Sequence, residues 1–495
     1  MIRITRRRII KTGFGAAAGV ALVKRASSGA LAQSTSAQTA VPSADLGLPV
    51  LGKVTPRASL VINASPLGIG FETLDRRIFD PTRTYDHLAK LGVKWARCQT
   101  GWARTETTKG VYDFKWLDDV VDSLIKIGIK PWFNLGYGNR LYTPGADEYA
   151  VGWIPMSSAE AREGWLNYTR KIAEHFGSRV QHWELWNEPN ITAFWKPAEP
   201  NPTEYAEFVK ITAPEIRRRV PQAVIIGGAF AGIPNSLDYL ERCLDAGMAE
   251  HIDRLSYHPY RAVPEENYET DVRAYRHLLA RYKQGVGLWQ GENGAPSQNG
   301  GLGALSNLDW NETRQAKWLL RRILIDLKVG VEMTSYFQTV DMTNYTLGGA
   351  GNVRTGTNFK GVLRGTDYTT KPSYFAYQSL CALFDGETKP ADLLLRLEKV
   401  GAAATVSVSF MRGERPLYVY WSPANLQQEY GAGKIDVNVW TGRAVALTNP
   451  VLINPLTSQV YRLEPKKNGG FLRFEGMPLM DYPLIITDKT VLGTE

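Results

Sequence analysis

Two short segments of the sequence each place a glutamate directly after an apolar run of the kind found in buried β-strands. They are residues 182–190 (HWELWNEPN) and residues 288–294 (LWQGENG). Pro189 lacks the N–H group that would extend a sheet, so the first strand must end beside Glu188. Cleavage of a glycosidic bond needs one carboxyl group to protonate the leaving oxygen and a second one across the sugar. The pattern therefore predicts Glu188 as the proton donor and Glu292 as the second carboxylate.

Both glutamates need a barrel of alternating strands and helices to bring them together. Between residues 66 and 384, short β-type runs alternate with amphipathic helix patterns. Helices are expected to begin at Asp80, at Asn201 and at a capping box over residues 157–160 (SSAE). Eight such units predict an α/β fold, a TIM (β/α)8 barrel. The glutamates then follow the fourth and seventh strands, at the end of the barrel where such enzymes carry their active sites. The predicted strands are residues 67–72, 94–98, 130–135, 182–186, 224–227, 254–257, 286–290 and 332–337.

The rest of the chain divides into segments that differ in composition and in hydrophobic pattern. Residues 385–495 hold short alternating runs interrupted by Pro, Gly and Asn, which predicts a C-terminal antiparallel β-sandwich domain. Residues 46–65 are predicted to add one strand to that sandwich. Residues 33–45, rich in Ser, Thr, Ala and Gln, predict a disordered lead-in. The predicted catalytic barrel, residues 66–384, is therefore flanked on both sides.

The charge distribution predicts export rather than nucleic-acid binding. The chain has 58 Lys and Arg against 49 Asp and Glu, a formal charge of +9. Residues 1–32 contain seven of the basic residues and no acidic one, so about +2 remains without them. Residues 5–11 (TRRRIIK) match a twin-arginine signal, and residues 30–32 (ALA) match its cleavage site. We therefore expect a periplasmic or secreted bacterial protein. The apolar run at 13–23 is too short to span a bilayer, so no membrane anchor is expected after signal cleavage.

The string at residues 186–190, Trp-Asn-Glu-Pro-Asn, with Phe-Trp at 194–195, resembles glycoside hydrolase family 39. This is the β-xylosidase and α-L-iduronidase family within clan A of the retaining glycoside hydrolases. The resemblance implies that Glu188 is the acid/base, that Glu292 is the nucleophile, and that Asn187 holds the sugar 2-hydroxyl. The implied function is exported, retaining hydrolysis of O-glycosidic bonds in an oligo- or polysaccharide. It proceeds by double displacement through a covalent glycosyl-enzyme intermediate.

The resemblance also implies an arginine at the end of the second strand and a His/Tyr pair after the sixth. Arg97, His258 and Tyr260 stand at those positions. Arg97 and Tyr260 would keep Glu292 ionised, through opposite charge and a donated hydrogen bond. Two alternatives remain open: Arg97 as a structural ion-pair partner of Glu184, and His258 as a loop histidine without metal-ligand spacing.

Further residues near strand ends are candidate sugar contacts. Trp102, Trp195 and Trp289 are predicted to bind substrate, and Trp153 lies in a similar place, because aromatic faces stack on pyranose rings. Packing in the core is the alternative for each of them. Glu72, after the first strand, is either an acceptor for a sugar hydroxyl or a salt-bridge partner.

Two positions depart from the family pattern. Gln99 stands where many relatives have His, and residues 335–338 (SYFQ) end the eighth strand without Trp. Both positions would touch the terminal sugar. Xylose specificity therefore does not follow from the resemblance, and the sugar, its anomer and its linkage stay open.

The sequence indicates neither a metal nor a cofactor. Cys98, Cys243 and Cys381 are far apart, cannot all pair, and show no metal-ligand spacing. The expected partner is an oligo- or polysaccharide, with no nucleic acid; the oligomeric state is not predicted. One alternative is an endo-acting exopolysaccharide hydrolase or a transglycosylase that uses the same two glutamates. The other is a non-catalytic carbohydrate-binding barrel.

Overall fold

The computed structural model describes residues 45–347, 353–401, 403–440 and 447–492. The predicted export signal at 1–32 and nearly all of the predicted lead-in at 33–45 lie outside these residues. Within the described ranges, no helix is both long enough and apolar enough to cross a membrane.

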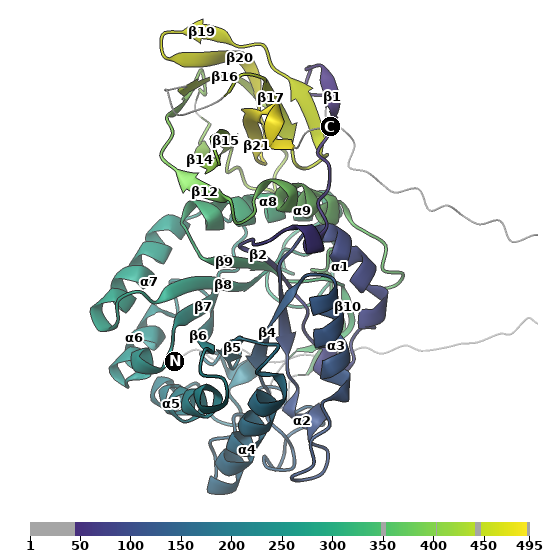
Figure 1. Ribbon diagram of the computed structural model, residues 1–495, viewed down its shortest axis with the longest axis vertical. Helices are drawn as coiled ribbons and strands as arrows, with labels where there is room; N and C mark the ends of the chain where they lie inside the picture. The colour runs from purple at the N-terminus through teal and green to yellow at the C-terminus, as the bar shows by residue number, and fades with distance from the viewer. Residues whose placement is uncertain (1–44, 348–352, 402, 441–446, 493–495) are drawn as a thin grey trace, which may run out of the picture. The chain divides into compact units, whose positions relative to one another are not determined.

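Eight parallel strands close into a barrel (Figure 1). Each strand pairs with the next in sequence, and the last pairs back with the first, through Leu67 opposite Thr334. This closed barrel confirms the predicted fold class. In order, its strands are β2 (Leu67–Gly70), β3 (Trp95–Gln99), β4 (Lys130–Leu135), β5 (His182–Leu185), β6 (Val224–Ala231), β7 (Arg254–His258), β8 (Gly287–Asn293) and β9 (Met333–Tyr336).

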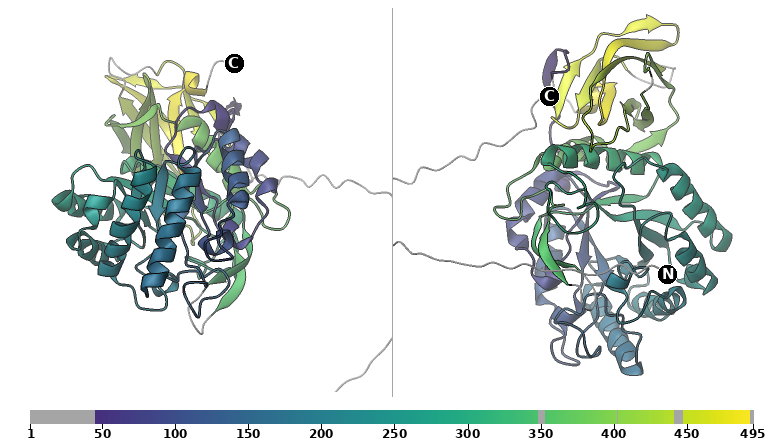
Figure 2. Two further views of the ribbon diagram at one scale, coloured as in Figure 1. Left: turned by 60° about the horizontal axis from the view of Figure 1, so that its bottom comes forward. Right: turned by 180° about the vertical axis from the view of Figure 1, so that it is seen from behind.

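Helices surround the strands (Figure 2), and side-chain caps begin the two longest of them. The Ser158 hydroxyl accepts the Ala161 amide at the start of α4 (Ala159–Phe176), and Asn201 caps α5 (Pro202–Arg219) in the same way. Such caps pair amide groups that the first helical turn leaves free. The other helices are α1 (Tyr85–Leu91), α2 (Trp102–Thr105), α3 (Lys115–Lys126), α6 (Leu237–Asp245), α7 (Tyr268–Tyr282), α8 (Glu312–Lys328) and α9 (Pro372–Leu383). Short 3-10 turns occur at Ser59–Val61, Leu74–Arg76, Pro81–Arg83, Thr192–Phe194, Met248–His251 and Lys489–Leu492.

The side chains that fill the interior of the barrel differ between its two ends. Near the beginnings of the strands, Trp132, Ile226, Trp289 and Met333 form a separate buried cluster against which Trp95 packs. This aromatic layer fills the interior at that end, as expected of a packed TIM barrel. The buried charged side chains Glu72, Arg97 and Glu184 lie toward the other end, where the strands open into their loops.

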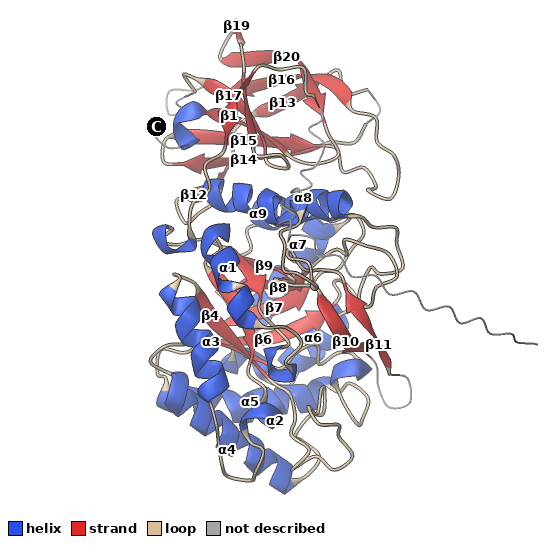
Figure 3. Ribbon diagram, turned by 90° about the vertical axis from the view of Figure 1, so that its right-hand side faces the viewer, coloured by secondary structure: helices blue, strands red, loops and turns tan. Residues whose placement is uncertain are grey.

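The C-terminal region is built from antiparallel strands in two sheets (Figure 3). One has seven strands in the order β1-β18-β17-β21-β15-β14-β12, and the other four in the order β13-β16-β20-β19. Strand β1, from before the barrel, pairs with β18 at Lys53 opposite Gln459. A separate hairpin of β10 and β11 follows the barrel. The strands are β1 (Val50–Lys53), β10 (Met342–Leu347), β11 (Arg354–Asn358), β12 (Thr388–Ala391), β13 (Leu395–Glu398), β14 (Val406–Arg412), β15 (Arg415–Trp421), β16 (Gly433–Trp440), β17 (Pro450–Asn454), β18 (Gln459–Arg462), β19 (Lys466–Asn468), β20 (Phe471–Leu479) and β21 (Leu484–Asp488).

Buried polar contacts join the C-terminal sheets to helix α8. Arg321 of α8 forms an ion pair with Glu265 at 2.6 Å and donates to the Ala424 carbonyl at 2.6 Å. The Trp421 indole donates to the same Glu265 at 2.7 Å. Arg321 and Glu265 both belong to the barrel, so separating the C-terminal sheets would keep their ion pair but would remove the Ala424 and Trp421 partners and uncover the fully buried Arg321.

Candidate active site

Glu188 lies at the mouth of the barrel on a strained stretch of backbone. Strand β5 ends at Leu185, and Trp186 and Glu188 then adopt left-handed conformations with φ of 72° and 47°. Such angles are uncommon for residues other than glycine and must be held by their surroundings. The Glu188 amide donates to the Ala229 carbonyl of β6 at 2.9 Å, which ties the turn to the neighbouring strand.

The environment of Glu188 favours its protonated form. Its side chain is only 12% exposed, and burial raises the pKa of its carboxyl group to about 7, although the charges of Arg97 and Lys360 act to lower it. Oε1 lies 2.8 Å from Nδ1 of His258. Burial lowers the pKa of His258 to about 4, so the imidazole is neutral at pH 7. A carboxyl group with a pKa near neutrality can donate a proton and later accept one.

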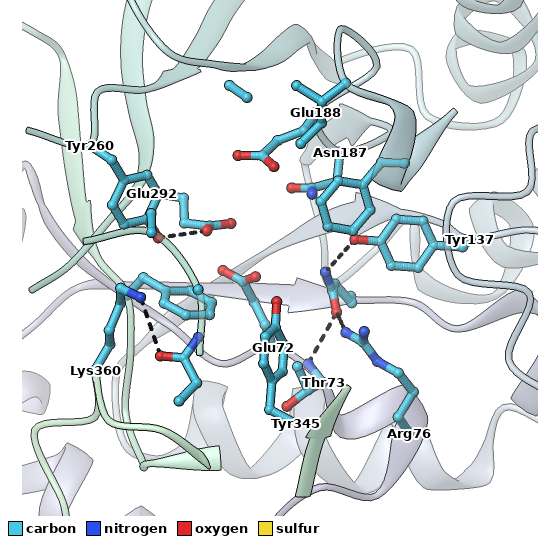
Figure 4. A pocket seen from close by; sticks show the side chains of 18 of the residues that line it. Glu72, Thr73, Arg76, Tyr137, Asn187, Glu188, Tyr260, Glu292, Tyr345 and Lys360 are labelled. Atoms are coloured by element: carbon cyan, nitrogen blue, oxygen red, sulfur yellow. Dashed lines mark hydrogen bonds between the residues drawn. The ribbon is translucent and has the colours of Figure 1, made fainter. Parts of the chain in front are cut away.

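Glu292, on strand β8, and Glu188 both line the cavity, and Figure 4 shows Tyr260 beside Glu292. Glu292 receives two donors. Arg97 donates to Oε2 at 2.7 Å, and the Tyr260 hydroxyl donates to Oε1 at 2.8 Å. A register shift between Gln290 and Asn293 marks a bulge at this point of the strand, and bulges re-aim side chains. One carboxyl oxygen of Glu188 and one of Glu292 lie within 4.8 Å of each other. The two carboxyl groups therefore share a site but have different neighbours.

Arg97 connects the charged groups of the site. It is fully buried on β3, with Nε 2.6 Å from Glu184 and Nη1 2.7 Å from Glu292. Its Nη2 donates to Asn187 Oδ1 at 2.9 Å. The sequence left two interpretations of Arg97 open, and both hold. Its guanidinium forms an ion pair with Glu184 and also donates a hydrogen bond to Glu292.

Glu72, at the end of β2, completes this group. Its Oε1 lies 3.2 Å from Arg97, and its side chain is 2% exposed. Burial raises the pKa of Glu72 well above its usual range, with Glu292 adding to the effect and Arg97 opposing it. Glu72 lines the cavity, so its carboxyl group is available to a ligand there.

A cavity of about 320 Å³ opens between these groups. The lining residues that were not predicted include Arg76, Tyr137, Tyr345, Asn358 and Lys360. Gln99, noted above as a departure, also lines it, and accepts hydrogen bonds from Arg76 at 2.5 Å and from the Thr73 amide at 3.1 Å. The unpredicted residues come from segments that follow the barrel strands, including the hairpin of β10 and β11. A glutamate that directly follows an apolar strand pattern can be recognised in the sequence, whereas a single Lys or Tyr far from such a pattern cannot.

Lys360 is a second cation in the cavity wall. Its side chain is 1% exposed, and Nζ makes a hydrogen bond to Asn358 Oδ1 at 3.4 Å and lies 5.6 Å from the centre of the Tyr260 ring. Burial lowers the pKa of Lys360 to about 7, while Glu292 and Glu188 act to raise it. An ammonium group can donate three hydrogen bonds, so Lys360 keeps donors for a ligand.

Three predicted substrate-binding tryptophans lie elsewhere, which corrects that prediction. Trp102, Trp195 and Trp289 are at most 4% exposed, and none lines the cavity. Trp102 stacks on Tyr142 and Tyr168 in the helical layer, and Trp289 belongs to the aromatic cluster at the far end of the barrel. Proximity to a strand end in sequence does not determine whether an indole points inward or toward a helix.

The site also has the spacing of a metal site. Glu188, His258 and Glu292 each offer one ligand atom, and these atoms lie within 4.8 Å of one another. However, His258 Nδ1 already lies against Glu188, and the buried Arg97 guanidinium already donates to Glu292. A cation at this point would face Arg97 and displace both contacts, so the arrangement suits proton transfer better than metal binding.

Comparison with known proteins finds a family model that matches part of the chain. The model for "Glycosyl hydrolases family 39" matches residues 88–285, a segment that contains Arg97, Glu188 and Tyr260 and ends before Glu292. The β-xylosidase of Geobacillus stearothermophilus is 28% identical over 162 residues, covering 31% of each chain. That of Caldicellulosiruptor saccharolyticus is 26% identical over 190 residues, covering 34% of this chain and 37% of its own. The matched segment spans about a third of the length of these curated relatives.

Solved structures extend the likeness to most of the fold. A family 39 glycoside hydrolase from the gut symbiont Bacteroides cellulosilyticus WH2 has a TM-score of 0.62 at 21% identity, covering 86% of this chain and 81% of its own. A family 39 β-xylosidase from Caulobacter crescentus has a TM-score of 0.54 at 18% identity, covering 89% of this chain and 98% of its own. With Glu188 and Glu292 opposed at the barrel mouth, the chain is similar to the glycoside hydrolases of family 39 in its fold and in part of its sequence.

Proposed function

We propose that the protein is a retaining glycosidase that cleaves O-glycosidic bonds of an oligo- or polysaccharide. The observation that carries the proposal is the pair Glu188 and Glu292, with oxygens within 4.8 Å and unlike surroundings. Carboxyl groups about 5 Å apart leave no room for a water molecule between one of them and the sugar, so that group attacks directly. The β-xylosidases among the relatives make xylosides the first substrates to test.

In the first step, Glu188 gives its proton to the glycosidic oxygen while a Glu292 oxygen attacks the anomeric carbon. The bond from that carbon to the leaving group breaks, the leaving group departs as an alcohol, and a glycosyl ester forms on Glu292. In the second step, the ionised Glu188 accepts a proton from water. The hydroxide attacks the anomeric carbon, and the Glu292 carboxylate is released. Two inversions give net retention.

The neighbours of Glu292 support both steps. Arg97 and Tyr260 donate to its two oxygens at 2.7 Å and 2.8 Å, which stabilises the carboxylate as it leaves the ester. Asn187 uses its carbonyl oxygen to accept from Arg97, so its amide N–H groups are oriented away from that contact and can meet a sugar hydroxyl. His258 holds Glu188 at 2.8 Å and fixes where its proton points.

The reaction is tested with a panel of 4-nitrophenyl glycosides of both anomers, followed by NMR of the first product. Early release of the retained anomer supports the proposal, and early release of the inverted anomer overturns it. Turnover with added EDTA tests independence from a metal. Binding without turnover would favour the carbohydrate-binding alternative, and sugar transfer to an acceptor in place of hydrolysis would favour a transglycosylase.

The Glu188→Gln protein separates the two roles. Loss of the acid should lower kcat/KM about 10²- to 10⁴-fold for alkyl glycosides, whose leaving groups need a proton. It should lower kcat/KM far less for 2,4-dinitrophenyl glycosides, whose leaving groups do not. An equal loss of kcat/KM for the two kinds of glycoside would show that Glu188 is not the acid.

We further propose that the protein is exported by the twin-arginine route to the periplasm or beyond. The support is the string at 5–11 and the concentration of basic residues in 1–32. Replacing Arg6 and Arg7 together by Lys should keep the protein in the cytoplasmic fraction of the producing bacterium. Unchanged export of that variant would contradict this route.

A further inference from the structure

A second cavity, of about 550 Å³, adjoins the catalytic one. The two share Arg76, Phe194 and Tyr345 as lining residues, so they meet at these side chains. Both volumes fall in the range of small-ligand sites. We propose that this second cavity binds the leaving-group sugars of an oligosaccharide while its reacting sugar occupies the catalytic cavity. This inference rests on the proposed glycosidase function and specifies its substrate.

The wall of the second cavity carries an aromatic ring suited to a sugar. Trp153 lines it, is partly exposed, and packs in neither hydrophobic cluster of the described residues. Trp102 and Trp195, by contrast, are buried in the core. A tryptophan that is held by its backbone but leaves its ring uncovered is the usual platform for the C–H face of a pyranose.

Trp153 is held in place by two loops that are joined through their backbones. The Ile154 amide donates to the Lys196 carbonyl at 3.1 Å, and the Lys196 amide donates to the Gly152 carbonyl at 2.7 Å. The Lys196 ammonium donates to the Val151 carbonyl at 2.9 Å. A Cβ atom at Gly152 would lie 2.4 Å from the Ala193 carbonyl oxygen, so only glycine permits this approach. The platform is therefore formed before any ligand binds, which lowers the entropy lost on binding.

Polar groups around the platform match sugar hydroxyls. The carboxylates of Asp147 and Glu148 are exposed and line the second cavity, and Arg76 lies at its junction with the first. Carboxylates accept hydrogen bonds from hydroxyl groups, and the guanidinium donates to their oxygens. Strand β10 contributes Asn344 and Thr346 to the lining of this cavity, and Val353 precedes β11. Figure 3 shows the hairpin that these two strands form.

The position of this cavity relative to Glu188 assigns it to the leaving group. The loop that follows Glu188 lines the catalytic cavity with Ile191 and Phe194, and then lines the second cavity with Ala193, Phe194 and Lys196. Glu188 must meet the glycosidic oxygen, whose far side bears the leaving group. Glu188 and Glu292 both line the catalytic cavity and not the second one, so the cleaved bond lies in the first cavity and the loop after Glu188 leads from it to the second.

Chain-length kinetics test the inference. The probes are oligosaccharides of two to six units of the sugar that the wild-type protein hydrolyses, labelled at the reducing end with 2-aminobenzamide. We expect kcat/KM to rise at least tenfold as sugars are added on the reducing side of the cleaved bond. Trp153→Ala should lower the ratio of kcat/KM between long and short substrates about tenfold, and Trp153→Phe should keep most of that ratio. Trp440→Ala, which removes a 40% exposed tryptophan from the C-terminal sheets, is the matched control and should keep it fully.

The outcomes separate this inference from the proposed function. Absence of hydrolysis of any glycoside would refute the glycosidase proposal itself. Two results would show that the second cavity does not bind sugars. One is hydrolysis whose kcat/KM does not rise with added sugars. The other is a rise in kcat/KM that both Trp153→Ala and Trp153→Phe retain. A gain that follows sugars added on the non-reducing side would overturn its assignment to the leaving group.

Discussion

Replacing the buried acid Glu188 by its amide should stabilise the protein at alkaline pH. Burial raises the pKa of Glu188 from 4.5 to about 7, so losing the proton is harder in the folded protein than in the unfolded chain. Its contribution to stability is therefore complete below pH 4.5 and is lost as the pH rises through 7. At about 1.4 kcal/mol for each tenfold change in ionisation constant, this loss amounts to about 3 kcal/mol. Glutamine has no proton to lose, so the variant avoids it.

The measurement is urea unfolding of the wild-type and Glu188→Gln proteins between about pH 5 and about pH 8. The free energy of unfolding of the variant minus that of the wild type should rise by about 2.5 kcal/mol across this range, because part of the full loss lies outside it. Burial lowers the pKa of His258 to about 4, so its contribution is present above pH 6.5 and lost as the pH falls. His258 is present in both proteins, so this opposite trend largely cancels in the difference. Glu160→Gln, at a side chain that is 69% exposed, serves as the control.

A difference that stays constant within about 0.5 kcal/mol over this range would refute the reasoning. It would show that Glu188 ionises in the folded protein as readily as in the unfolded chain. The physical basis for assigning it as a proton donor at neutral pH would then be lost, even if the variant were inactive.

Further predictions concern the neighbours of this acid. Arg97→Met leaves buried carboxyl groups without their shared cation, and should lower the free energy of unfolding by about 3–5 kcal/mol in urea; an unchanged midpoint would contradict this. Tyr260→Phe removes one hydrogen bond to Glu292 and should lower kcat about 10- to 100-fold at an unchanged Tm, which activity and melting assays check together. Lys360→Met removes a charge that lowers the pKa of Glu188, so the alkaline limb of kcat/KM should move to higher pH; a move to lower pH would oppose the assignment. Glu292→Ala should prevent covalent labelling by a 2-deoxy-2-fluoro glycoside, and mass spectrometry of the labelled wild type should find the adduct on Glu292.

The barrel could be predicted from the sequence because its strands and helices have strong local signals. The predicted strand 130–135 matches β4 (Lys130–Leu135), and Asn201 caps α5 as predicted. Ser158 caps α4 one residue after the start of the predicted capping box. Apolar runs and cap residues act within a few positions of the chain, so one segment carries enough information. The same holds for Glu188 and Glu292, which stand at strand ends.

The walls of the cavity could not be predicted in this way. Lys360 and Tyr345 lie beyond the last barrel strand, and only the path of the loops brings them to Glu292. Trp102 and Trp289 show the opposite error, since residues near strand ends can point to a helix or to the far end of the barrel. Side-chain direction in loops depends on long-range packing, which no local pattern encodes.

The pairing of β1 with β18 has a consequence for biosynthesis. Val50 opposes Tyr461, so this edge of the seven-stranded sheet joins residues about 400 positions apart. A ribosome releases β1 long before its partner exists, and until then the early strand has free backbone donors and acceptors that another chain could bind. The sheet can close only when synthesis is almost complete. Shortening the chain from its C-terminal end would therefore also free a strand near its beginning, so the barrel cannot simply be cut away from the sheets that follow it.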